Sequence, residues 1–184
     1  VGNKNQLQIT RTMRRAPEKR KGFTLVELLL YVGLSSLLLL TMTLFLSTLL
    51  ESRVRNQTVS EVEQQGAAAL RAIAQALRNA ENITSPAQGG SASSLTLDVL
   101  NAANDPTVFD LASGALRITE GVGSPVALTN SRVTVSALTF QNLSRTGTPG
   151  TVRAVFTISH VNPSGRHEYQ FQKTFTGSGT LRQP

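Results

Sequence analysis

The chain has 184 residues and a formal net charge of +7, from 18 lysines and arginines against 11 acidic residues. It contains no cysteine, which excludes a disulfide framework, a thiolate nucleophile and a sulfur-ligated metal site. Residues 1–21 hold seven of the cations and one glutamate, so this short segment carries +6 of the +7. The rest of the chain is nearly neutral, which argues against nucleic acid as a partner of the folded part.

A long uncharged apolar run follows the basic segment. Residues 28–50 contain no charged side chain, and at about 1.5 Å per residue they would form a helix of roughly 35 Å. A bilayer core is about 30 Å thick. A cleavable secretory signal has a shorter apolar core followed by a small-residue cleavage site, and neither feature occurs here. The sequence therefore predicts a membrane-spanning helix that is kept in the mature protein.

The charge on either side of this run predicts its orientation. Lysines and arginines crowd the N-terminal flank, whereas only Arg53 and Arg55 follow the run closely. By the positive-inside rule the N-terminus stays in the cytoplasm and everything after Glu51 crosses the membrane. We expect a single-pass protein of the cytoplasmic (inner) membrane with an extracytoplasmic head.

A single carboxylate, Glu27, stands at the start of the apolar segment. A charged side chain at the centre of a membrane helix costs about 2.5–3.5 kcal/mol on insertion scales and usually marks function. Its position in the first turn is favourable for a negative charge. A cation brought close to Glu27 would remove much of the remaining penalty.

The segment KGFTLVE, residues 21–27, after a basic leader and before the apolar run, resembles the class III signal of type IV pilins and type II secretion pseudopilins. This resemblance implies cleavage by the prepilin peptidase between Gly22 and Phe23, on the cytoplasmic side, and N-methylation of Phe23. It also implies that Glu27 meets the free N-terminal amine of a neighbouring subunit in a filament.

The same resemblance implies the partners: other pilin or pseudopilin subunits, the prepilin peptidase and an inner-membrane assembly platform. The implied function is that of a structural subunit of a type IV pilus or type II secretion pseudopilus. The ending FTGSGTLR, which follows the predicted sheet, is similar to that of minor pilins and J-type minor pseudopilins.

After residue 50 the pattern becomes amphipathic. Apolar or small residues recur at three- and four-residue steps, which predicts a helix that continues to about Asn82. They are Val59, Val62, Gly66, Ala69, Leu70, Ile73, Leu77 and Ala80. The segment NITSPAQGGSASS then ends the helix, because proline and glycine favour a loop.

Downstream of this loop the apolar period changes to two, which predicts β-strands. The alternating positions are Leu95, Leu97 and Val99, then Leu116 and Ile118, then Val133 and Val135. The apolar positions shift by one residue between Ala137 and Leu138, which indicates a β-bulge. A hairpin is expected about residues 162–165, with Ile158 opposite Tyr169, Phe156 opposite Phe171, and Val152 opposite Phe175.

The predicted fold class is therefore α+β, with a long N-terminal transmembrane-plus-amphipathic helix packed on an antiparallel β-sheet head, as in pilins. The chain divides into a cleaved basic leader (1–22), a transmembrane or filament-core helix (23–50), an amphipathic second half of that helix (51–83) and an antiparallel β head (84–184).

Catalytic and metal-binding motifs are absent from the sequence, so we expect no enzymatic activity and no cofactor. The predicted hairpin sets His160 opposite His167, but no third metal ligand follows from the pattern. Calcium stays open as an alternative, because oxygen donors gather in the segment DVLNAANDPTVFD, although their spacing matches no known loop. These donors are Asp98, Asn101, Asn104, Asp105 and Asp110.

Two rival functions also stay open. One is a tip-located pilin that binds DNA or an adhesion target, for which scattered arginines would have to cluster into a phosphate-binding surface. These are Arg117, Arg132, Arg145, Arg153 and Arg166. The other is a single-pass, signal-anchored membrane protein that is never cleaved.

Overall fold

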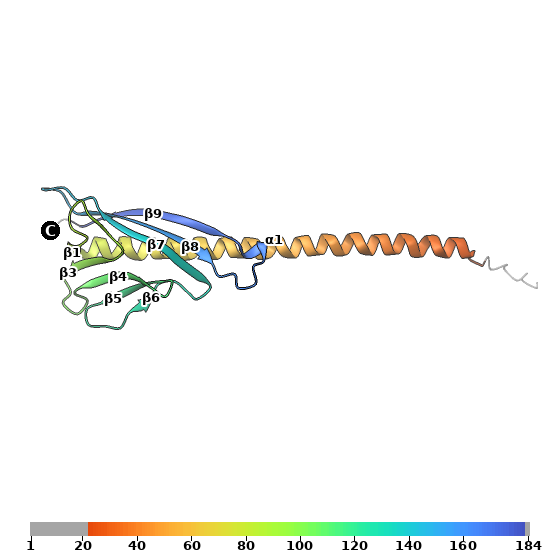
Figure 1. Cartoon of the computed structure of the whole chain (residues 1–184), viewed down its shortest axis with the longest axis horizontal. Coiled ribbons are helices and arrows are strands. Elements are labelled where there is room, and N and C mark those ends of the chain that lie inside the picture. The colour runs from red at the N-terminus through yellow and green to blue at the C-terminus, as the bar shows by residue number, and fades with distance from the viewer. Residues whose placement is uncertain (1–21, 183–184) are drawn as a thin grey trace, which may run out of the picture. The chain divides into compact units, whose positions relative to one another are not determined.

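A computed structural model describes residues 22–182 of the chain. The predicted basic leader up to residue 21 lies outside these residues. The described chain divides into two units at residue 45, and each is considered by itself. The described elements begin with one α-helix, α1 (Leu25–Asn79), and continue with strands β1 to β9 and a short 3₁₀ helix, η1. Figure 1 labels most of them.

The first unit contains the start of α1, whose side chains are almost all exposed. Among the described residues α1 is the helix that is long and apolar enough to cross a membrane. Three of its hydroxyl groups, those of Ser36, Thr41 and Thr43, donate to carbonyls of the preceding turn of their own helix, at 2.8–2.9 Å. Because these polar groups are satisfied within the helix, the segment suits an apolar solvent.

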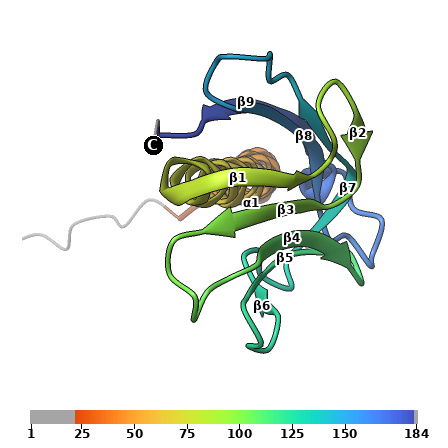
Figure 2. The ribbon, with the colours of Figure 1, turned by 90° about the vertical axis from the view of Figure 1, so that its left-hand side faces the viewer.

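In the head, the second half of α1 packs one stripe against two antiparallel sheets. The buried stripe consists of Thr58, Val62, Gly66, Ala69, Ile73 and Leu77. These residues follow the predicted three- and four-residue steps. Figure 2, a view along the helix, shows β8 and β9 passing on one side of it and β3 on the other. The predicted α+β arrangement of a long helix packed on antiparallel β-structure is confirmed, and the strands of the head form two sheets.

The first sheet has the strand order β1-β3-β4-β5-β6. Its strands are β1 (Ala80–Ser85), β3 (Leu95–Val99), β4 (Thr107–Ala112), β5 (Ala115–Glu120) and β6 (Val126–Ala127). The second sheet has the order β2-β7-β8-β9. Its strands are β2 (Ser91–Ala92), β7 (Val133–Asn142), β8 (Thr151–His160) and β9 (Gln172–Thr180). Phe109 from the first sheet and Phe140 and Phe156 from the second are fully buried in the shared core.

The helix ends at Asn79, earlier than the predicted Asn82. Residues 80–85 instead form β1, which pairs with β3 through Ala80 and Val99 and through Ile83 and Leu97. Asparagine, isoleucine and threonine at 82–84 are weak helix formers. Ladder hydrogen bonds with β3 therefore replace the last helical turn.

The predicted hairpin register is wrong by four residues. Phe156 pairs with Phe175 and Val152 with Gly179, instead of Phe171 and Phe175. The connection is longer than expected because the Asn162 side chain closes a loop, donating to the Arg166 carbonyl at 2.8 Å and accepting from the Arg166 amide at 3.1 Å. The 3₁₀ helix η1 (His167–Tyr169) then occupies residues assigned to the strand.

The predicted bulge in β7 is confirmed. The β7–β8 pairing is irregular between Ser136 and Thr139, and Ala137 has a φ of 54°. This extra residue changes which alternate positions of the strand face the core. Val133 and Val135 before it and Leu138 and Phe140 after it are therefore all buried.

Candidate functional site

The predicted cleavage position lies in exposed backbone just before α1. Residues 22–24 have no helical assignment, and α1 begins at Leu25. Phe23 is 74% exposed, and a Cβ placed on Gly22 would meet no atom within 4 Å. An exposed, non-helical peptide bond is the kind of backbone that a protease can bind in extended form. The bond between Gly22 and Phe23 is thus accessible within the described chain.

Thr24 fixes the start of the helix. Its Oγ1 accepts a hydrogen bond from the Glu27 amide at 3.2 Å, and its carbonyl accepts one from the Leu28 amide at 3.1 Å. This is the N-cap arrangement, in which a threonine hydroxyl satisfies an unpaired amide of the first turn. The sequence analysis did not single out Thr24, although a threonine three residues before a glutamate is the pattern of a capping box.

Glu27 is half-buried in the first turn of α1. The Tyr31 hydroxyl, one turn later, donates to its Oε1 at 3.4 Å. No lysine or arginine within residues 22–182 forms an ion pair with Glu27. In an apolar solvent, a carboxylate with one long hydrogen bond would retain most of its desolvation penalty. An added cation would be favoured beside Glu27 in such a solvent.

Tyr31 also contacts the residue that would become the new N-terminus. The rings of Phe23 and Tyr31 meet edge to face, with centroids 6.1 Å apart and planes at 76°. Tyr31 thus contacts Phe23 through its ring and Glu27 through its hydroxyl, on one side of the first two turns. The sequence analysis missed this role, for which the four-residue step from Glu27 to Tyr31 is the available signal.

The two histidines of the predicted hairpin do not face each other. His160 Nδ1 lies 2.9 Å from the Val161 carbonyl, and its ring stacks on Tyr169. His167 Nδ1 lies 3.3 Å from Gln170 Oε1. Each ring is thus engaged locally, because the four-residue register shift separates them. Across residues 22–182 no group of three or more metal-ligating side chains gathers.

The oxygen donors considered for calcium serve turns and an ion pair. Asn101 Oδ1 accepts from the Ala103 amide at 3.1 Å, and Asp105 Oδ1 accepts from the Val99 amide at 3.3 Å. Asp110 binds Arg117 through both oxygens, at 2.9 and 2.6 Å. The structure does not bring these donors together around one point.

The arginines considered for DNA binding are mostly paired with carboxylates. Arg117 binds Asp110, Arg132 binds Glu61 and Arg166 binds Glu168. The Asp110 hydrogen bond raises the pKa of Arg117. Hydrogen bonds from Asn130 and Arg132 to Glu61 outweigh its desolvation and lower the pKa of this carboxyl. Guanidinium groups neutralised in this way offer little charge to a phosphate backbone.

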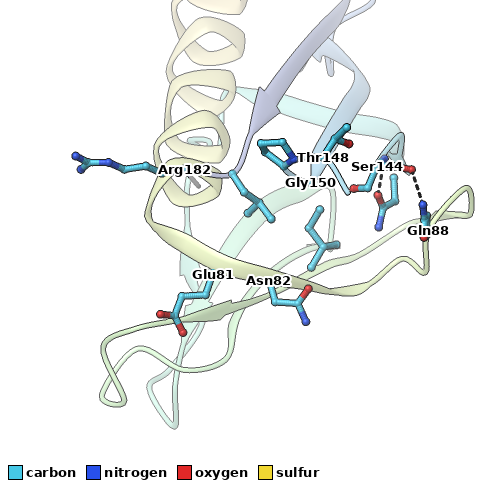
Figure 3. A pocket seen from close by; sticks show the side chains of 11 residues that line it. Glu81, Asn82, Gln88, Ser144, Thr148, Gly150 and Arg182 are labelled. Atoms are coloured by element: carbon cyan, nitrogen blue, oxygen red, sulfur yellow. Dashed lines mark hydrogen bonds between the residues drawn. The ribbon is translucent and has the colours of Figure 1, made fainter. Parts of the chain in front are cut away.

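A hollow of about 300 Å³ lies between β1, the loop before β8 and the end of the described chain. Figure 3 shows that the Glu81 carboxylate and the Arg182 guanidinium extend away from the other labelled side chains. Gln88 Nε2 donates to the Ser144 carbonyl at 3.0 Å, and the buried Asn142 accepts from the Ser144 amide at 3.0 Å. These polar groups hold the surrounding loops together and do not converge on a ligand.

Comparison with protein-family models, with curated proteins and with solved structures finds no match to this chain.

Proposed function

We propose that the chain is a structural subunit, of the minor type, of a type IV pilus or type II secretion pseudopilus. In this proposal the prepilin peptidase cleaves between Gly22 and Phe23, and Phe23 is then N-methylated. The subunit is held in the cytoplasmic membrane by the first half of α1. It is later assembled into a helical filament whose core is built from these helices.

The observation that carries the proposal is the incomplete neutralisation of Glu27. Cleavage after Gly22 would create an α-amine four residues before this carboxylate, at the start of the same apolar segment. An amine on a neighbouring subunit would remove the penalty of Glu27, and Glu27 would do the same for the amine. Filament growth would therefore be favoured over the separated, membrane-embedded subunits.

Two further features support the proposal. The apolar side chains of α1 before residue 46 are exposed, so this segment requires either lipid or the helices of other subunits as its solvent. The head builds its own core from α1 and two sheets, without contributions from this segment. A subunit organised in this way can leave the bilayer without unfolding its head.

The decisive experiment is intact mass spectrometry of the protein purified from cells with and without the prepilin peptidase. We expect cells with the peptidase to give a chain that lacks residues 1–22 and carries one added methyl group. Cells without it should give the full-length chain. An intact leader in peptidase-positive cells would contradict the proposal and favour an uncleaved membrane anchor.

A pair of glycine variants makes this test specific. Gly22→Val should retain the leader, because the side chain obstructs the backbone at the cleaved bond. Gly33→Val, in the same apolar segment, should be processed normally. A Cβ at either position meets no atom within 4 Å, so both sites are open to a side chain. Equal processing of the two variants would show that Gly22 is not part of the recognised signal.

A further inference from the structure

The last strand of the second sheet, β9, has one edge that pairs with no other strand of the described chain. Within residues 22–182 it hydrogen-bonds only to β8, over nine residue pairs without a register shift. The His160 amide donates to the Phe171 carbonyl and the Leu181 amide to the Gly150 carbonyl, so odd-numbered residues bond to β8. The backbone groups of the even-numbered residues must then point to the free edge. These are Gln172, Thr174, Thr176, Ser178 and Thr180.

This edge differs from the other sheet edges of the described chain. β2 and β6 have two residues each, and β1 is interrupted by two register irregularities. Short and bulged strands are the usual protection of a sheet edge against pairing with another chain. β9 is long and regular and contains no proline, and Lys173 near its start is bonded to Glu63 of α1. It therefore keeps the geometry needed to accept a further strand.

An added strand would lie along a basic face of α1. A hollow of about 220 Å³ lies between the sheet and the helix here, lined by Leu70, Arg71, Ile73 and Ala74 of α1, Val152 and Ala154 of β8, and residues 177–179 of β9. Arg71 lines this hollow and belongs to a row of exposed α1 residues that recur at three- and four-residue steps. They are Gln64, Ala68, Arg71, Gln75 and Arg78. The face is thus made of small, amide and guanidinium side chains.

The two arginines on this face lack carboxylate partners among residues 22–182. Arg71 Nε donates to the Ala67 carbonyl at 3.2 Å, and neither Arg71 nor Arg78 forms a salt bridge there. They stand two helical turns apart, about 10 Å along the axis. Side chains on one face of a strand are spaced about 6.7 Å apart. Carboxylates at alternate positions of an added strand can therefore reach both.

We propose that the free edge of β9, beside α1, binds an extended segment of a partner polypeptide with carboxylates at alternate positions. Its backbone would pair with the free edge of β9, as in β-strand addition. Its acidic side chains would face Arg71 and Arg78, and its other side chains would continue the hydroxyl-rich outer face of the sheet. There Thr157 and Thr174 are bonded at 2.8 Å. This inference concerns the head alone and does not depend on processing at Gly22.

The test uses the full chain in detergent micelles and a fluorescently labelled nine-residue peptide in which threonine alternates with aspartate. The control peptide carries lysine in place of aspartate. We expect salt-sensitive binding of the aspartate peptide and at least tenfold weaker binding of the lysine peptide. The double variant R71E/R78E should reverse this preference, because two exposed charge pairs together are worth about tenfold in affinity. R153A, on the outer face of β8, should leave the affinity unchanged.

Thr176→Pro tests the strand edge itself. It removes an amide that points to the free edge and leaves the β8 ladder intact, so an edge strand tolerates it. We expect binding of the aspartate peptide to be lost while the circular dichroism spectrum is unchanged. Thr176→Ala keeps the amide and should bind normally. Equal binding of the two peptides, or full affinity of Thr176→Pro, would overturn the proposal. Self-association of the chain that Thr176→Pro abolishes would also overturn it, in favour of a second copy as the occupant.

Discussion

Replacement of Gly66 by alanine is a direct test of how α1 and β9 pack in the head. Gly66 is a buried position of the helix, and a Cβ built there would overlap the ring of Phe175. That ring is not free to move away, because it stacks on Phe156 with centroids 5.7 Å apart. Phe156 is itself fully buried. The added methyl group must therefore displace β9 or the helix.

Two opposing contributions determine how much Gly66→Ala changes the free energy of unfolding. Alanine is favoured over glycine inside a helix by about 1 kcal/mol. Overpacking of a well-packed core costs about 1–3 kcal/mol, and the direct overlap with a fixed ring places Gly66→Ala in the upper part of that range. We expect the variant to lose about 1–2 kcal/mol of unfolding free energy.

The assay is chemical denaturation of the full chain in detergent, followed by circular dichroism. The matched control is Ala68→Gly, two residues further along α1 on its exposed face, which should cost about 1 kcal/mol through helix propensity alone. In the background of Phe175→Leu, which shortens the opposing side chain, Gly66→Ala should lose most of its cost. A Gly66→Ala variant that gains about 1 kcal/mol, as an unobstructed helical site would, refutes this account of the packing.

The remaining predictions concern charge and buried polar groups. Glu27→Gln should sharply reduce incorporation of the subunit into filaments, because a neutral amide cannot form an ion pair with an amine as a carboxylate does. Incorporation is measured by immunoblot of sheared fibres. Normal incorporation of the variant would exclude that pairing. The pKa of Glu61 is lowered in the folded head, so its stabilisation is present above the ordinary pKa of 4.5 and lost as the pH falls below it. Melting temperatures of Glu61→Gln should accordingly fall less between about pH 5 and pH 3 than those of the unaltered chain. Asn142 is buried and donates to the Pro86 carbonyl at 2.8 Å, so Asn142→Ala should cost about 1–3 kcal/mol of unfolding free energy by leaving buried partners unsatisfied.

The parts of the fold that depend on local periodicity could be predicted from the sequence. The buried stripe of α1 and the strand at residues 95–99 follow from steps of three, four and two residues, and the bulge at Ala137 follows from a change of phase. The hairpin register could not be predicted in this way. A shift of four residues leaves the same side chains on the same face, so Phe175 is buried in either register. The alternation of apolar and polar residues therefore cannot distinguish the two registers.

Only part of the candidate site at the start of α1 could be predicted from the sequence. Glu27 is visible in the sequence because a carboxylate in an apolar run is costly wherever it lies. Thr24 and Tyr31 are ordinary residues of a helix start, and their roles appear only when a hydroxyl stands at hydrogen-bond distance from an amide or a carboxylate. The division of the head into two sheets depends on long-range pairing, such as β2 with β7, which no local pattern encodes.

The contacts of Glu27 also bear on when assembly would be favoured. In a single subunit the Tyr31 hydroxyl supplies one weak hydrogen bond at 3.4 Å, which stabilises the carboxylate without neutralising it. An amine supplied by a second subunit would add a full opposite charge in a low-dielectric environment, where the attraction is several times stronger than in water. The Tyr31 hydroxyl would then lower the desolvation penalty of Glu27 in the unassembled subunit, but it would not take the place of the amine. The weak hydrogen bond from Tyr31 would allow the single subunit to remain in the membrane. The stronger pairing of Glu27 with an amine would favour its transfer into a filament.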